Sequence, residues 1–306
     1  MMHQSSGRWR LGLALSMLTV FLWGILPIAL TVTLQVLDVY TVIWFRFSVS
    51  FGLLAIYLGV QGKLPTLERL RAASWKLLAI ATIFLALNYL LFLQGLSLTS
   101  PANAEVIIQL SSLLLGLGGL VIFKEHYQLR QWLGVSVLIL GYILFFHEQL
   151  TNLITGHGQY LLGSGLVVLG SAAWAIYALA QKQLLQSLSS AQIMLIIYGG
   201  CAFLFTPFAK NQIVLTLSNL HLGMLLFCAL NTLIAYGAFA ESLAHWEASR
   251  VSAVIALAPI VTLIAVETVS VIVPALIPHE KMTLLGIFGA VLVVVGAVVI
   301  ALRKAD

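Results

Sequence analysis

Three ionisable side chains lie inside long apolar stretches of the chain. Arg46, Glu105 and Glu267 each fall within a run of hydrophobic residues. A charged group at the centre of a bilayer costs about 2.5–3.5 kcal/mol on insertion scales, and it usually faces a partner or a cavity. Arg46 and Glu105 therefore either form an ion pair that fixes two helices, or face a cavity as substrate contacts. In the second case Glu105 is also a candidate for carrying a coupled proton. We place Glu267 near a headgroup or a loop.

Aromatic and amide side chains form the second group of candidates. They are Trp23, Trp174, Tyr89, Tyr236, Asn88 and Asn231. Tryptophan usually lies at membrane interfaces, so Trp23 and Trp174 in mid-run either pack between helices or line a cavity. Buried amides need hydrogen-bond partners, which the backbone of a neighbouring helix or a ligand supplies. Together with Arg46 and Glu105, these six residues are our predicted substrate-binding set.

No arrangement for catalysis or metal binding accompanies these residues. The seven histidines fall at termini, in loops or at the ends of apolar runs, and none is spaced with Cys or carboxylates as metal ligands are. A phosphate-binding Walker loop is absent, so ATP is not the direct energy source. We therefore expect no catalytic residue, no metal and no cofactor, and we do not expect an enzyme.

The elements that must position these side chains are membrane helices. Of the 306 residues, 61% are hydrophobic and 8% are charged, against about 45–50% and about 25% in soluble domains. This composition excludes a water-soluble globule, and the two cysteines exclude a disulfide scaffold. The net charge of +5 forms no nucleic-acid patch, because the basic residues are spread between apolar runs. The sequence predicts an all-α polytopic membrane protein.

Ten segments have the roughly 20 apolar residues that a spanning helix needs. They are 10–32, 40–60, 75–97, 101–123, 129–147, 159–181, 190–209, 219–241, 247–273 and 282–302. If the N-terminus is cytoplasmic, the cytoplasmic segments hold Arg8, Arg10, Lys63, Arg69, Arg71, Lys76, Lys124, Arg130, Lys182, Arg250, Arg303 and Lys304. The outer segments hold only Lys210 and Lys281. Because lysine and arginine concentrate on the inside, both termini are predicted to be cytoplasmic.

The chain also repeats itself. Glu, Gly and Gly follow at the same intervals in both halves, as Glu125, Gly134 and Gly141 and as Glu280, Gly289 and Gly296. Residues 89–110 overlay 236–257, and Trp23 overlays Trp174. The repeat divides the chain into residues 1–150 and 151–306, each with five predicted spans. Five is odd, so the second half is predicted to enter the membrane inverted, as in many secondary transporters.

These features together resemble the EamA-type carriers of the drug/metabolite transporter superfamily. The resemblance rests on two five-helix halves, a Trp in the first helix of each, and Glu before the Gly-x6-Gly pair of each last helix. The segment 248–253 with Ala258-Pro259 is similar to the family's fourth-helix segment. The first half departs from that pattern at 102–105 and has Ser112 where the family usually has Pro. The resemblance implies the carrier fold and favours export of amino acids or related metabolites.

The leading hypothesis is a secondary carrier of the inner membrane that works by alternating access. Arg46 is the only Lys or Arg deep in a predicted span, so a neutral or zwitterionic metabolite is favoured over a phosphorylated one. The expected partners are this small-molecule substrate, the lipid bilayer and, if transport is coupled, protons. The alternatives are a carrier that exports cationic drugs and a non-transporting membrane protein on the same fold.

Overall fold

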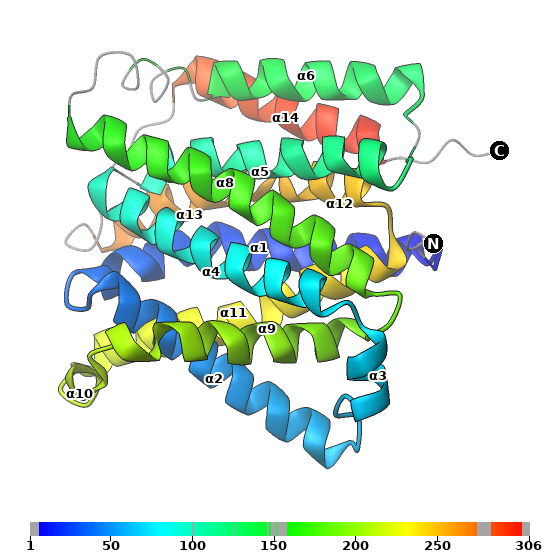
Figure 1. Ribbon diagram of the computed structural model, residues 1–306. Coiled ribbons are helices and arrows are strands. Elements are labelled where there is room, and N and C mark those ends of the chain that lie inside the picture. Colours follow the sequence, from blue (N-terminus) through cyan, green and yellow to red (C-terminus); the bar gives the residue numbers. More distant parts are fainter. Residues whose placement is uncertain are drawn as a thin grey trace.

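A computed structural model of the chain describes residues 6–99, 101–125, 127–145, 147, 151, 158–273 and 283–301. Within these residues every regular element is a helix, and the long helices lie side by side in one bundle (Figure 1). In chain order they are α1 (Trp9–Leu34), α2 (Val39–Val60), α3 (Leu67–Ala72), α4 (Trp75–Leu98), α5 (Pro101–Ile122), α6 (Leu129–Phe145), α8 (Gln159–Leu184), α9 (Ser190–Phe205), η1 (Thr206–Phe208), α10 (Asn211–Val214), α11 (Asn219–His245), α12 (Ala248–Ile255), α13 (Ala258–Ile272) and α14 (Leu284–Ala301).

Polar residues at the helix starts supply the hydrogen bonds that the first turn lacks. The Asp38 carboxylate accepts a bond from the backbone N–H of Thr41 at the start of α2, at 3.0 Å. Ser74 caps α4 in the same way, and Ser189 and Gln192 form a reciprocal capping box at α9. Hydrocarbon offers no hydrogen bonds, so intrahelical bonds and such caps must satisfy the backbone of a membrane helix.

Seven helices in the described part are long and apolar enough to cross a bilayer. They are Trp9–Leu34, Val39–Val60, Trp75–Leu98, Gln159–Leu184, Ser190–Phe208, Asn219–His245 and Ala248–Ile272. Three shorter apolar helices, Ile107–Ile122, Leu129–Phe145 and Leu284–Ile300, lie within three further expected spans. The all-helical class is confirmed, while ten crossings and the inversion of the second half stay predictions. α1 begins and α14 ends at the same end of the bundle (Figure 1).

The ninth expected span is a broken helix. α12 ends at Ile255 and α13 begins at Ala258, with Pro259 in its first turn. Proline has no backbone N–H, so the carbonyl of Ile255 loses its usual donor four residues later. The N–H of Ile260 bonds to the carbonyl of Leu257 at 3.1 Å, so the carbonyl of Ala256 also loses its helical donor. The break therefore exposes backbone carbonyls in the middle of a predicted membrane span.

Two other segments differ in detail from the expectation. The span predicted at 190–209 ends its α-helix at Phe205, and the short 3-10 helix η1, which contains Pro207, begins at Thr206. The loops after α2 and α9 carry the short helices α3 and α10, which the apolar runs did not predict. Both short helices lie at the ends of the bundle (Figure 1).

α6 and α14 pack closely through the glycines that recur in both halves. A Cβ atom on Gly141 would lie 2.6 Å from the backbone nitrogen of Val293 and 2.9 Å from the carbonyl oxygen of Gly289. One on Gly296 would lie 2.8 Å from the carbonyl oxygen of Gly134. Backbone atoms cannot give way as a flexible side chain can, so this approach requires glycine. Small residues at such contacts are how membrane helices come close.

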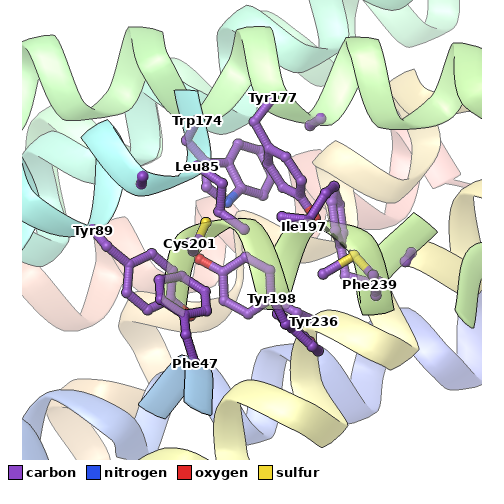
Figure 2. Packing of buried hydrophobic residues seen from close by; sticks show 14 of the residues in the cluster. Phe47, Leu85, Tyr89, Trp174, Tyr177, Ile197, Tyr198, Cys201, Tyr236 and Phe239 are labelled. Atoms are coloured by element: carbon purple, nitrogen blue, oxygen red, sulfur yellow. Dashed lines mark hydrogen bonds between the residues drawn. The ribbon is translucent and has the colours of Figure 1, made fainter. Parts of the chain in front are cut away.

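The centre of the bundle is a cluster of buried aromatic side chains (Figure 2). It contains Phe47, Tyr89, Trp174, Tyr177, Tyr198, Tyr236 and Phe239, packed with Leu85, Ile197 and Cys201. Their hydroxyl groups find acceptors inside the protein, as Tyr198 does at the carbonyl of Thr232, 2.8 Å away. The cluster joins α2, α4, α8, α9 and α11, and the cavity described below lies against it.

We expect Gly141→Ala to destabilise the folded protein by about 1–3 kcal/mol, because the added methyl group overpacks the α6–α14 contact. The matched control is Gly52→Ala in α2, where a Cβ meets nothing within 4 Å. The control should be neutral or more stable by up to about 1 kcal/mol. Thermal unfolding in detergent, followed by circular dichroism, measures both. Equal melting temperatures would contradict the close contact.

Candidate functional site

A cavity opens beside the aromatic cluster, between α1, α2, α4, α5, α8, α11 and the break between α12 and α13. Its lining residues are Trp23, Leu26, Pro27, Leu30, Arg46, Asn88, Tyr89, Phe92, Leu93, Glu105, Ile108, Gln109, Ser111, Ser112, Trp174, Tyr236, Ile255 and Ala258. The space that the centre of a water molecule can occupy inside it is about 90 Å³. One water needs roughly 10–15 Å³ by this measure, so the cavity has room for several waters or for a small polar ligand.

Most of the predicted substrate-binding set lies around this cavity. Trp23, Arg46, Asn88, Tyr89, Glu105, Trp174 and Tyr236 all line it. Asn231 does not, because its amide Nδ2 donates to the carbonyl of Leu22 at 2.6 Å and ties α11 to α1. Asn88 makes a similar bond to the carbonyl of Gly170 at 3.0 Å and also borders the cavity. Both amides therefore bond to the backbone of a neighbouring helix.

Arg46 is held in one orientation on the cavity wall. Its side chain is buried, its Nε donates to the hydroxyl of Thr232 at 2.9 Å, and one Nη donates to the hydroxyl of Tyr89 at 3.4 Å. The guanidinium carbon also lies 4.5 Å from the ring centre of Tyr89. A guanidinium has five N–H groups, and these two neutral hydroxyls are its side-chain partners among the described residues. The guanidinium of Arg46 thus has hydrogen-bond acceptors, but its positive charge is not neutralised by a carboxylate in the described part of the chain.

Glu105 lies on the same wall without forming the ion pair that we considered. The ion pairs of the described residues are Lys182–Glu125, His245–Glu241 and Arg250–Glu247. Arg46 turns instead toward Thr232 and Tyr89, on α11 and α4. The buried carboxyl of Glu105 shares a hydrogen bond with the side chain of Gln109, one helical turn away. The cavity wall therefore carries a cation and a carboxyl that do not form an ion pair with each other.

Two tryptophans and two tyrosines supply the aromatic part of the wall. The ring of Trp23 lies 5.7 Å from that of Trp174 and 4.9 Å from that of Tyr236, edge to face in both cases. The ring centres of Tyr236 and Tyr89 are 5.5 Å apart. These rings both pack and line the cavity, so the two alternatives for Trp23 and Trp174 are compatible. The indole N–H of Trp23 has no hydrogen-bond partner among the described residues.

Sequence reasoning missed the part of the wall that the broken helix contributes. Ile255 and Ala258 line the cavity from the two sides of the break. Tyr142 of α6 stands behind this wall, where its hydroxyl donates to the carbonyl of Ala256 and lies 3.3 Å from Oε1 of Gln109. The available signals were Pro259 inside an apolar run and a tyrosine in the middle of a predicted span. Neither signal predicts that the hydroxyl of Tyr142 meets the carbonyl of Ala256, because the two residues are far apart in the chain.

A second polar cluster joins the loop after α5 to α8 and α12. Glu125 accepts hydrogen bonds from Nζ of Lys182 at 2.7 Å and from the backbone N–H groups of Ala248 and Ser249 at 2.9 and 3.0 Å. α8 continues to Leu184, beyond the expected end of this span at residue 181, and Lys182 is buried against Glu125. Burial alone would raise the pKa of Glu125. The ammonium of Lys182 and the bonds from Ser249 outweigh it and hold that pKa below its ordinary value.

Among the described residues, no three His, Cys, Asp or Glu side chains come together as metal ligands. Four of the seven histidines (His3, His126, His157 and His279), Glu280 and residues 302–306 lie outside the ranges that the structure describes. The polar groups that the described residues bring to the cavity are a guanidinium, a carboxyl, two amides, hydroxyls and an indole N–H. Groups of these kinds can bind and orient a small molecule.

Comparison with known proteins gives this arrangement its context. The profile of the EamA-like transporter family matches residues 10–147 and again residues 161–302. The chain belongs to the EamA-like transporter family. Together with the apolar helices, this membership makes it a multi-pass membrane protein of a transporter family, and it indicates a transporter rather than an enzyme.

Relatives of this EamA family chain cover nearly its whole length. An "Uncharacterized transporter" of Haemophilus influenzae is 37% identical over 292 residues, 95% of each chain. The "Uncharacterized inner membrane transporter YhbE" of Escherichia coli K12 is 38% identical over 298 residues, 97% of this chain and 92% of that one. A "Probable amino-acid metabolite efflux pump" of the same strain is 23% identical over 297 residues, 92% of each. A crystal structure 16% identical shares the fold, with a TM-score of 0.71 over 94% of this chain and 96% of that chain.

We expect Glu125→Gln to destabilise the protein by about 3–5 kcal/mol at neutral pH, because it leaves Lys182 buried without its counter-charge. The lowered pKa means that the carboxylate stabilises the fold fully above its ordinary value of 4.5, and that this contribution is lost as the pH falls through the lower folded value. Unfolding in detergent as a function of pH should show the variant and the wild type converging under acidic conditions.

The double variant Glu125→Gln, Lys182→Met is the control for this pair. Methionine removes the buried charge, so the double variant should be more stable than Glu125→Gln alone. A double variant that is less stable by the sum of both single effects would show that the two side chains do not interact.

Proposed function

We propose that this EamA family protein is a secondary carrier that moves a small neutral or zwitterionic metabolite, an amino acid or a related compound, across the inner membrane, with export as its direction. The observation that carries the proposal is the un-neutralised guanidinium of Arg46 beside a separate carboxyl on an aromatic cavity wall. A free α-amino acid has the complementary pair of charges.

Each end of a zwitterion has a partner on the wall. A carboxylate would bind the free N–H groups of Arg46, whose planar fork matches carboxylate geometry. An ammonium group would bind over the faces of Trp23 and Tyr236 or at the carboxyl of Glu105. Arg46 is the single Lys or Arg among the lining residues of the described cavity, which disfavours phosphorylated substrates because they need several cations.

The architecture that we propose is ten spans in two inverted halves, residues 1–150 and 151–306, with both termini in the cytoplasm. The repeated family match and the close contact between the recurring glycines of α6 and α14 support it. The lysine and arginine bias of the loops supports the orientation. In such an arrangement the halves rock around the cavity, which takes its walls from both of them.

The relatives support the membrane and the substrate class. One is named an inner membrane transporter and another a probable amino-acid metabolite efflux pump. A carrier of cationic drugs is the second candidate, since aromatic rings and Glu105 would bind an organic cation without Arg46.

Counterflow in proteoliposomes tests the proposal. Vesicles containing the purified protein are loaded with one unlabelled amino acid, and uptake of the labelled compound is followed without an ion gradient. We expect saturable uptake in the wild type. In Arg46→Gln the apparent KM should rise about tenfold or more, because a charge-assisted bond worth about 1.5–3 kcal/mol is lost.

Decarboxylated substrate is the matched comparison. The amine that lacks the carboxylate should bind the wild type weakly and should not distinguish it from Arg46→Gln, while Arg69→Gln on the exposed helix α3 should behave as wild type. Counterflow of amines or drugs but not of amino acids would reject the zwitterion in favour of the cationic class. Absence of counterflow with every compound would reject the carrier.

A further inference from the structure

A chain of hydrogen bonds connects the cavity carboxyl to the break between α12 and α13. Glu105 bonds to the side chain of Gln109, and Oε1 of Gln109 lies 3.3 Å from the hydroxyl of Tyr142. Tyr142 in turn donates to the carbonyl of Ala256, which the break has deprived of its helical donor. Three elements, α5, α6 and the α12–α13 break, thus share one polar path.

Counting hydrogens shows that this path has two alternative arrangements. An ionised carboxylate only accepts, so it draws the amide N–H₂ of Gln109 and leaves the amide oxygen toward Tyr142 and Ser112. Tyr142 then has one hydrogen for two acceptors, Gln109 and the Ala256 carbonyl. When Glu105 is ionised, the amide oxygen of Gln109 and the carbonyl of Ala256 therefore compete for the hydroxyl hydrogen of Tyr142.

A proton on Glu105 removes this competition. The carboxylic acid then donates to the amide oxygen, and the turned-over amide of Gln109 donates to the oxygen of Tyr142. Tyr142 gives its single hydrogen wholly to the carbonyl of Ala256. The break is firmly capped in this arrangement and loosely capped in the other.

We propose that Glu105 exchanges a proton with the water of the cavity during transport, and that Gln109 and Tyr142 transmit its charge state to the α12–α13 break. This inference rests on the proposed carrier function. Ile255 and Ala258 flank the break and line the cavity, so a change at the break changes the shape of the binding site. Proton and substrate affinities are then linked, and the linkage is reciprocal. Tyr142 is a positioning residue, since it touches the break and not the cavity.

Other charged and titratable groups lie elsewhere on the wall or away from it. Arg46 on α2, Tyr89 on α4 and Tyr236 on α11 face the cavity with Glu105. α6 contributes Tyr142 itself. The charged groups of α8 and α12, Lys182 and Arg250, have Glu125 and Glu247 as ion-pair partners near the ends of their helices. Glu105 is thus the carboxyl on the described cavity wall, and it has no ion pair among the described residues.

The test compares exchange with gradient-driven accumulation in the same vesicles, using the amino acid found by counterflow. The wild type should accumulate substrate when a pH gradient is imposed. Glu105→Gln should lose this accumulation to a greater extent than it loses counterflow, because its carboxyl also borders the substrate site. Tyr142→Phe should retain counterflow and reduce the accumulation about fivefold or more, the lower end of typical coupling between sites.

Tyr127→Phe is the matched control. Tyr127 also donates its half-buried hydroxyl to a carbonyl of α12, that of Ser249 at 3.2 Å, and no hydrogen bond among the described residues joins it to Gln109. This variant should behave as wild type in both assays. A second readout, proton release or uptake when substrate is added to unbuffered protein in detergent, should be present in the wild type and absent in Glu105→Gln.

The outcomes separate this inference from the proposed function. Counterflow without gradient-driven accumulation in the wild type would overturn the proton role and leave the carrier standing. Equal losses in Tyr142→Phe and Tyr127→Phe would overturn the path through Gln109. If the wild type shows no counterflow, the carrier itself fails. A pH-dependent tryptophan fluorescence lost in Tyr142→Phe and kept in Tyr127→Phe would then still support the path, and its absence would reject it.

Discussion

A polar group inside this bundle can be satisfied only by another part of the protein, because the surrounding hydrocarbon offers it nothing. The amide N–H groups of Asn88 and Asn231 meet the demand by donating to backbone carbonyls of α8 and α1. Lys182 meets it with the carboxylate of Glu125. Groups that are satisfied in this way hold helices together. Arg46 is left with bonding capacity, and it lies on the wall of the cavity that we propose as the substrate site.

The same demand explains why the cavity lies where the helices are least regular. A continuous helix uses all of its backbone groups internally, so its carbonyls contribute nothing to a site. The proline in α13 frees carbonyls beside the cavity, and the hydroxyl of Tyr142 captures one of them. Packing through glycines keeps α6 and α14 together. The glycine contact between α6 and α14 thus lies close to the break between α12 and α13.

Much of this arrangement could be predicted from residue types alone. Charges and amides inside apolar runs are rare enough that Arg46, Glu105 and Asn88 stood out, and the repeat related Trp23 to Trp174 and Tyr89 to Tyr236. Which of two partners a polar group chooses could not be predicted. Arg46 bonds to Thr232 and Tyr89 rather than to Glu105 because of where α4 and α11 bring their hydroxyls, and helical periodicity carries no information on that. Burial of Lys182 depended on a carboxylate far away in the chain.

The break between α12 and α13 also has a consequence for how the chain enters the membrane. α12 has 8 residues, about 12 Å of helix, against roughly 30 Å of hydrocarbon. It cannot cross alone, so 248–272 must be inserted as one segment of 25 residues. The carbonyl of Ala256 meets Tyr142 only after this segment packs against α6, which is synthesised and inserted earlier. The cap on the break therefore forms only once residues 248–272 have met α6, and it is absent while this segment is being made.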